Sequence, residues 1–488
     1  MLMVHGNQYG FSTLEIMIAF VVILSAITAA MLLVFGNQTL AVDGSTSSDA
    51  LLLAEKQLRG VYEIAQQDFN LIVPKSPGAD GLYTVSLQVQ SIDRYTKQVT
   101  SIAAWQRDMR SESVRLTALA TNWRGGDAAD TCNSVISGDW KNPQVVSYSF
   151  GADILGDTVN NFPVTSLDAK DGKLYASIGD TATAGSADLF VLDISHPSVK
   201  PALMASVDNS PTVKTGLNAI VVAGQYAYTA SAYGANFTTC TQGPACAQMQ
   251  IFDISVNPPQ LKVNFKVPGV LGKSGQAIGQ SIFYRDGYVY LGLAKTAGGP
   301  EFNIIDVHDP LHPLYAGGYA VGSGVNAVIV KNGFAYVASP NDEELLILQV
   351  VNPAAPVRVN GFNAPGGSGN GKSLALVGSN LFLGRTLGGN ELYVLNVAQP
   401  SSFGTLGAKD LGNDSLNGLV IRDYLAFLIT NTQLQIVRTD NLVNIVQYSN
   451  PVSLPGNKGT AIDCEGNFLY IGSVPGTNKG FLSVVTAL

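Results

Sequence analysis

The chain has 488 residues, of which 46% are hydrophobic and 13% are charged. It can therefore bury a large core and hold more than one domain, which excludes a disordered chain. The formal net charge of −8, with no run rich in Lys or Arg, argues against nucleic acid as a partner.

The first predicted element is an apolar helix over 16–35, in which only Ser25 and Thr28 are polar. Twenty helical residues span roughly 30 Å, the thickness of a hydrocarbon core. A cleaved signal peptide is one alternative, although "SAITAA" is followed by the apolar "MLLVF". A plain signal anchor is another. We expect a long N-terminal transmembrane α-helix.

A carboxylate, Glu15, stands at the start of this run and needs a cation there. Together with Gly10, Phe11 and Thr-Leu at 13–14, it resembles the N-terminus of the type IV pilin family. The resemblance implies a leader over 1–10, cleavage by prepilin peptidase between Gly10 and Phe11, and N-methylation of Phe11. It also implies that Glu15 pairs with the N-terminal ammonium of a neighbouring subunit and sets the register of assembly.

The stretch that follows predicts a small mixed region. Apolar residues recur at helical spacing over 47–69, so the pilin-like helix is expected to run over 11–70. Alternating apolar residues from Tyr83 to Val89, a turn, and a restart at Val99 predict a hairpin. The region 80–130 resembles the small β-sheet of pseudopilins, and a generic antiparallel sheet explains it equally well.

Seven repeats occupy the rest of the chain. A turn followed by a short aromatic strand recurs, beginning near residues 171, 223, 285, 331, 377, 422 and 464. Each copy is followed by an apolar third strand such as "LFVLDIS" or "FNIIDV". A spacing near 45 residues is typical of a four-stranded propeller blade. A solenoid would need polar caps at both ends, and none is evident.

The last repeat lacks an outer strand, and a spare strand over 143–150 precedes the first. We therefore expect a seven-bladed β-propeller over 143–488, closed by that strand. The units "LFVLDISHPSVKP" and "FNIIDVHDPLHP" resemble the LVIVD repeat family of extracellular propellers. The predicted fold class is mainly β: a seven-bladed β-propeller preceded by a long N-terminal transmembrane α-helix and a small pilin-like β-sheet.

The four cysteines form two candidate disulfides. Cys240 and Cys246 are close in a long polar loop, where a disulfide in an oxidising compartment competes with free thiols. Zinc would need two more ligands, and no further Cys or His is near. Cys132 lies just before the closing strand and Cys464 in a turn of the blade that this strand completes, so the second pair would lock the ring.

No catalytic, metal or cofactor constellation emerges. His196, His308 and His312 fall in turns after third strands. The acidic cluster at 341–346 lacks the ligand spacing of a calcium loop, which favours a solvated turn. The segment 366–373 fits the phosphate-loop spacing, but both flanks predict propeller strands, which favours a glycine-rich connection. We expect no cofactor, no metal and no enzyme activity.

The longest loops, over 179–188 and 232–248, offer contact surface. Tyr233 and Phe237 are the candidate contact residues, although the second loop could equally be one that merely tolerates length.

The predicted function is a minor pilin or pseudopilin that displays its propeller for adhesion or for binding an extracellular protein or glycan. Its expected partners are other pilin subunits, prepilin peptidase and the membrane. It would reside in the inner membrane before assembly and at the cell surface or in a filament afterwards. The alternatives are a membrane-tethered propeller that does not polymerise and a propeller enzyme.

Overall fold

The computed structural model describes residues 21–25, 27–28, 31, 45–62, 64, 72–93, 96–107, 110–121, 132 and 136–487, with gaps at 180–185, 211–215, 233–235, 241–242, 274, 341–342, 366–368, 387, 457 and 475–478. The chain divides into two compact units, Met1–Asn122 and Trp123–Leu488.

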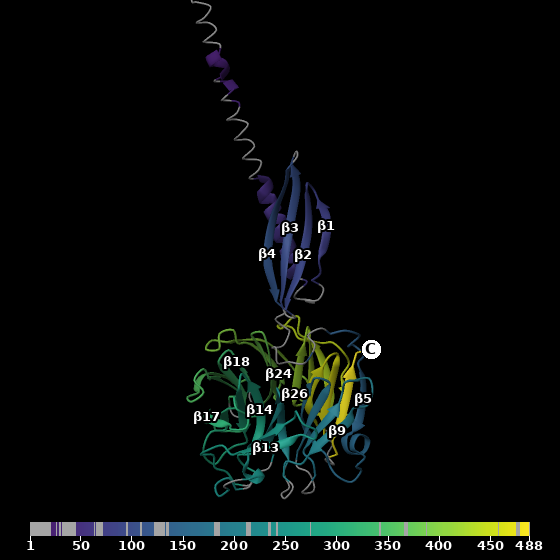
Figure 1. The fold of residues 1–488 in the computed structure, drawn as a ribbon, viewed down its shortest axis with the longest axis vertical. Coiled ribbons are helices and arrows are strands. Elements are labelled where there is room, and N and C mark those ends of the chain that lie inside the picture. The colour runs from purple at the N-terminus through teal and green to yellow at the C-terminus, as the bar shows by residue number, and fades with distance from the viewer. Residues whose placement is uncertain are drawn as a thin grey trace, which may run out of the picture. The chain divides into compact units, whose positions relative to one another are not determined.

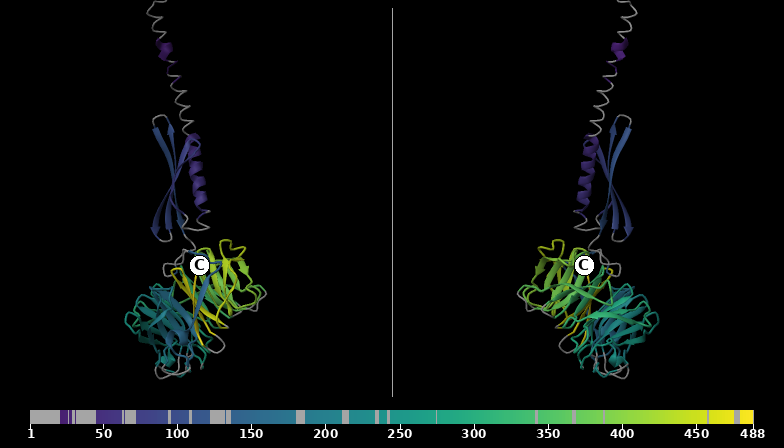
Figure 2. Two further views of the ribbon diagram at one scale, coloured as in Figure 1. Left: turned by 90° about the vertical axis from the view of Figure 1, so that its right-hand side faces the viewer. Right: turned by 90° about the vertical axis from the view of Figure 1, so that its left-hand side faces the viewer.

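The first unit packs a helical segment over 45–62 on one face of a four-stranded antiparallel sheet (Figure 2). The strands follow chain order: β1 (Lys75–Asp80), β2 (Tyr83–Asp93), β3 (Thr96–Arg107) and β4 (Arg110–Thr121). The predicted hairpin forms β2 and β3. The sequence patterns missed β1 because all six of its residues are exposed and no apolar alternation marks it.

Helical periodicity places Ala50, Ala54 and Val61 against the sheet, where each is buried. Leu51, another of the apolar residues over 47–69, is instead 45% exposed.

The prediction of a long transmembrane helix is wrong by this structure. In the described part of the chain, no helix is both long and apolar enough to cross a membrane. Of the predicted span over 16–35, the structure describes only 21–25, 27–28 and 31, which are helical and exposed. The remainder of the span lies outside the described residues. An apolar run has the composition of a membrane span, but composition alone does not determine whether a helix of sufficient length forms.

The second unit contains seven sheets in the described residues, which we call blades 1 to 7 (Figure 1). Blades 1 to 3 are β6 (Val164–Lys170), β7 (Lys173–Ile178), β8 (Leu189–Asp193), β9 (Ala202–Val207); β10 (Leu217–Ala223), β11 (Tyr226–Ser231), β12 (Met249–Asp253), β13 (Gln260–Phe265); and β14 (Gly279–Arg285), β15 (Tyr288–Leu293), β16 (Phe302–Asp306), β17 (Leu314–Tyr319).

Blades 4 to 6 are β18 (Ala327–Lys331), β19 (Phe334–Ala338), β20 (Leu345–Gln349), β21 (Val357–Phe362); β22 (Gly371–Val377), β23 (Asn380–Arg385), β24 (Leu392–Asn396), β25 (Gly404–Lys409); and β26 (Gly418–Arg422), β27 (Leu425–Ile429), β28 (Gln433–Arg438), β29 (Val446–Gln447), β30 (Val452–Ser453).

Blade 7 joins both ends of this unit and closes the ring. It contains β31 (Gly459–Glu465), β32 (Phe468–Ser473), β33 (Phe481–Thr486) and the early strand β5 (Gln144–Ser149). Strand β5 pairs antiparallel with β33, so that Gln144 faces Thr486 and Ser149 faces Phe481 (Figure 1). The predicted closing strand over 143–150 is confirmed, and closure leaves no open edge in the ring. Two short turns of helix, η2 (Phe150–Leu155) and η3 (Pro244–Cys246), complete the described elements.

The first strand of each blade forms the innermost ring, in which β6, β10, β14, β18, β22, β26 and β31 contact one another in turn. A tight turn links it to the second strand. In blades 1, 3 and 4 this turn is Asp-Gly or Asn-Gly, with a left-handed first residue such as Asp171 (φ 54°). In blade 6 the glycine is replaced by Tyr424, and Asp423 (φ 49°) supplies the positive φ, which Asp tolerates better than most residues.

Candidate functional site

The centre of the propeller is a bore with a cavity of about 740 Å³. Equivalent positions on the seven inner strands line it: Asp168, Val221, Phe283, Ile329, Ala375, Val420 and Asp463. Five of the seven are apolar, and the two carboxylates lie on neighbouring blades 7 and 1. The lining at this level of the bore is therefore asymmetric, with acidic residues on one side and apolar residues on the other.

The two carboxylates join blades to each other. Asp463 accepts a hydrogen bond from the backbone N–H of Ala169 at 2.6 Å, and Asp168 accepts one from the N–H of Val222 at 2.8 Å. Burial, followed by the negative charges of Asp168 and Asp171, raises the pKa of Tyr175 to about 12. The carboxylates of Asp168 and Asp463 thus place negative charge in the bore and also accept hydrogen bonds from backbone amides of the next inner strand.

Metal binding in the bore has one candidate cluster among the described residues. Single ligand atoms of Cys132, Asp463 and Cys464 lie within 4.8 Å of one another. The two sulfurs are joined in a disulfide, so no thiolate is left to bind a metal. One carboxylate remains, which is too few protein ligands for a structural metal site.

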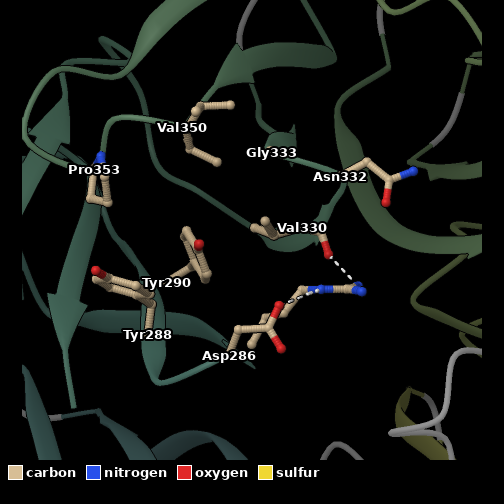
Figure 3. A pocket seen from close by; sticks show the side chains of 10 residues that line it. Asp286, Tyr288, Tyr290, Val330, Asn332, Gly333, Val350 and Pro353 are labelled. Atoms are coloured by element: carbon tan, nitrogen blue, oxygen red, sulfur yellow. Dashed lines mark hydrogen bonds and ion pairs between the residues drawn. The ribbon is translucent and has the colours of Figure 1, made fainter. Parts of the chain in front are cut away.

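At the turn end of the bore, Lys170, Arg285 and Asp286 line the cavity. Arg285 and Asp286 also line a second hollow of about 330 Å³ between blades 3 and 4, which we call the blade 3–4 groove (Figure 3). Its other walls are aromatic, aliphatic and amide side chains or backbone from both blades: Tyr288, Tyr290, Val330, Asn332, Gly333, Val350, Val351 and Pro353. The bore and the groove therefore share one charged rim.

The charges of the rim are held in fixed positions. Arg285 donates from Nη1 to the carbonyl of Val330 at 2.9 Å and from Nε to Asp286 at 3.4 Å (Figure 3). The carboxylate of Asp286 is 87% exposed. The ring of Tyr288 meets the ring of His308 edge to face at 5.2 Å between centroids. The groove thus presents a cation, an anion and an aromatic edge side by side.

Several predicted site residues lie outside the described residues: Gly10, Phe11, Glu15 and Tyr233. Phe237 does not fit its expected role as a surface contact. It is 1% exposed and belongs to the core formed with residues such as Tyr228 and Val267, because burial removes the apolar ring from water.

Both candidate disulfides are present, Cys132–Cys464 with a Cα–Cα distance of 5.0 Å and Cys240–Cys246 with one of 5.7 Å. In addition, Cys132 forms a backbone bridge to Gly466, so the segment before the closing strand lies against blade 7. The first bond links the entry of the propeller to its last blade.

Two of the histidines lie in turns beside aspartates, and the glycine-rich segment leads into a strand. His308 and His312 each contact an aspartate at 2.8 Å, Asp306 and Asp309, within the same turn. The last three residues of the segment 366–373 begin strand β22. A phosphate loop would lead into a helix there, so that interpretation is excluded.

The acidic cluster at 341–346 is not simply a solvated turn. Glu343 pairs with Arg358 at the surface, but Glu344 is 1% exposed and pairs with Arg385, whose side chain is fully buried. Glu344 also accepts from the N–H of Ala364 at 3.0 Å.

This arrangement is repeated around the ring, and sequence reasoning missed it. A buried acid or amide immediately before the third strand accepts from a backbone N–H that follows the outer strand in five blades: Asp188, Gln248, Glu301, Glu344 and Glu391. The signal was available as an Asp, Glu or Gln before "LFVLD", "MQIFD", "FNIID", "LLILQ" and "LYVLN".

Comparison with known proteins bears on the repeats. The LVIVD repeat family matches residues 175–209 and 323–363. None of the curated proteins matches the chain. A solved protein from Lactobacillus plantarum is 12% identical, with 62% of this chain and 87% of that one covered and a TM-score of 0.48. A candidate 6-phosphogluconolactonase from Bacteroides uniformis is 13% identical, with 59% and 86% covered and a TM-score of 0.46.

The extracellular domain of a candidate one-component system from B. thetaiotaomicron is 12% identical, with 82% of this chain and 53% of that chain covered and a TM-score of 0.48. Likenesses at these identities and TM-scores carry no argument about function. The chain is a propeller with matches to the LVIVD repeat in blades 1 and 4.

Proposed function

We propose that the propeller is a binding module that works outside the cytoplasm and recognises an extracellular protein or glycan. The observation that carries the proposal is the rim shared by the bore and the blade 3–4 groove. It places Arg285, Asp286 and Tyr288 around one concavity, and Tyr and Arg are the residues that most often dominate binding energy.

Two disulfides support a location outside the cytoplasm, because such bonds persist in oxidising compartments. Among the described residues, the bore holds Asp168 and Asp463, which already bind backbone amides, and Asp286, which already accepts from Arg285. A propeller enzyme would use converging acids, bases or metal ligands, so a binding role fits these side chains better.

The test uses the purified full-length chain on a glycan array and on an immobilised panel of extracellular matrix proteins. The variant Tyr288→Ala removes the aromatic edge of the groove. Tyr226→Ala is the matched control, because Tyr226 occupies the same position in blade 2, is partly buried as well, and does not line the groove.

We expect saturable binding that Tyr288→Ala weakens about 30-fold and Tyr226→Ala leaves within about twofold. The absence of saturable binding to every component, or an equal loss in the two folded variants, would overturn the proposal.

A second candidate function is that of a pilin-like subunit, supported by the Gly10, Phe11 and Glu15 pattern and by the first unit. There the helical segment over 45–62 leaves Leu51, Leu52 and Tyr62 45%, 60% and 57% exposed. An apolar strip of this kind suits packing against other subunits. In this proposal prepilin peptidase processes the chain at the inner membrane, and assembly carries it to the cell surface.

N-terminal sequencing of the mature protein tests this second candidate. A start at methylated Phe11 supports it, and a start at Met1 contradicts it. In cells, Glu15→Ala should abolish incorporation into filaments while Glu55→Ala, which alters an exposed helical ion pair with Arg59, should not. Normal incorporation of the Glu15 variant would remove the proposed assembly mechanism.

A further inference from the structure

The mouth of the bore opposite the turns carries a ring of polar side chains, which we call the polar girdle. It holds one residue from each blade, at the start of its inner strand: Thr165, Asn218, Gln280, Asn326, Lys372, Asn417 and Thr460. In blades 1, 2, 3, 5 and 7 this residue is the extra one in a β-bulge, between paired positions such as Gly371 and Ser373. Bulges redirect a side chain out of the regular alternation of a strand.

Most members of the polar girdle bind the next blade. The hydroxyls or amides of five members donate to a group at the start of the following inner strand: Thr460 to Val164, Thr165 to Leu217, Asn218 to Gly279, Gln280 to Asn326, and Asn326 to Gly371. Asn417 binds Asn431 within its own blade at 3.0 Å. The girdle is thus a belt of hydrogen bonds around the mouth.

Lys372 is the exception. It is the single cationic member of the polar girdle, and it makes no hydrogen bond or ion pair with any residue that the structure describes. Burial, followed by the charge of Lys458, lowers the pKa of its ammonium group. A half-buried ammonium with a second cation near it, and with no anion paired to it among the described residues, is costly, and a bound anion would remove that cost.

The surface leading inward from Lys372 is apolar. Leu374, two residues further along β22, lines the bore cavity, as do Leu376, Leu419 and Ile421. Two residues of a strand span about 7 Å, which is well within the length of a short alkyl chain. On the opposite side, Asp168 and Asp463 would repel a second negative charge on the ligand.

We propose that this mouth binds the carboxylate of an amphipathic monocarboxylic acid, with the headgroup at Lys372 and the apolar tail in the bore. The site goes beyond the function proposed above, because it lies at the other mouth and takes a small molecule. The amides of the polar girdle add donors for the second carboxylate oxygen.

The experiment titrates sodium octanoate into the full-length protein by calorimetry, with octylamine and acetate as comparison ligands. The variants are Lys372→Met, which keeps the length of the side chain without its charge, and Lys409→Met, a half-buried lysine on the outer strand β25 of the same blade. Thermal melts followed by circular dichroism confirm that both variants fold. Removal of a desolvated charge gives no reason for Lys372→Met to unfold.

We expect octanoate to bind one to one and more tightly than acetate or octylamine, and its affinity to fall about tenfold or more in Lys372→Met but less than about twofold in Lys409→Met. Affinity should also fall as the pH rises through the pKa of Lys372, with a flat profile in Lys372→Met, which a merely structural lysine would not produce. Equal octanoate affinity in wild type and Lys372→Met, no saturable binding, or tight octylamine binding would overturn the proposal. None of these outcomes depends on the blade 3–4 groove.

Discussion

The propeller has carboxylates in two settings: buried ones that recur before the third strands, and half-buried ones in the bore that do not recur around the ring. Before the third strands, an acid or amide recurs in five blades and each member fixes a backbone N–H of its own blade. At the equivalent bore-lining position of the seven inner strands, only blades 7 and 1 have carboxylates, Asp463 and Asp168, while the other five positions are apolar. The repeated side chain stabilises the fold of the five blades that contain it, whereas the two bore carboxylates make one side of the bore chemically different from the other.

The largest effect on stability is expected at Glu344, one of the repeated buried acids. The change Glu344→Gln leaves the buried guanidinium of Arg385 without its counter-charge, so we expect the propeller to lose about 3–5 kcal/mol of its free energy of unfolding. Urea unfolding followed by tryptophan fluorescence measures this, because Trp140 is buried in the propeller and packs on Phe427 at 4.8 Å.

The neighbouring residue provides the control. Glu343 is 40% exposed and pairs with Arg358, which is 44% exposed, so Glu343→Gln should cost less than about 1 kcal/mol. Equal losses in the two variants would show that the repeated acid contributes no more than a surface charge.

The two disulfides allow a second test. Cys132–Cys464 spans 332 residues and ties the closing strand to blade 7, whereas Cys240–Cys246 spans six. Changing Cys132 and Cys464 together to Ser should cost about 2–5 kcal/mol, and the Cys240 and Cys246 pair should cost less, because a shorter closed loop restricts the unfolded chain less. The urea midpoints of both double variants test this expectation. A larger loss of stability in the Cys240 and Cys246 variant would contradict the argument.

The pattern of turns and aromatic strands predicted the seven blades and the closing strand because both depend on local periodicity and on the count of strands. The predicted membrane span was wrong because it rested on composition alone, and no helix in the described part of the chain is both long and apolar enough to cross a membrane. Phe237 was misplaced because an aromatic residue in a long loop gives no sign of whether its ring folds back onto the core.

The missed site residues depend on geometry that a single strand does not contain. Arg285 and Tyr288 become one rim with Asn332 only when blades 3 and 4 are placed side by side. Lys372 looked like part of a phosphate-loop pattern, and its position in the polar girdle follows from the bulge at the start of β22. Aligning the seven inner strands by their turns would have revealed the only lysine among hydroxyls and amides.

The smallest expected effect concerns acids that are repeated yet only half-buried. Asp193, Asp253 and Asp306 end the third strands of blades 1 to 3, and each accepts a hydrogen bond from the N–H two residues later. Hydrogen bonding lowers the pKa of all three carboxyls, with the hydroxyl of Ser255 as the largest cause at Asp253. A folded pKa below the unfolded value of about 3.9 means that the stabilisation is present above that pH and is lost as the pH falls through the folded pKa.

Blade 5 indicates how to isolate that contribution. Asn396 occupies the same position and accepts from the N–H of Ala398 at 3.0 Å, so an amide can maintain this turn without titrating. Asp253→Asn should therefore fold normally, with a slightly lower urea midpoint at neutral pH that converges with the wild-type value below about pH 4. Parallel midpoints for the two proteins across the acid range would mean that the charge of Asp253 contributes nothing, and that these repeated aspartates serve the turns through geometry alone.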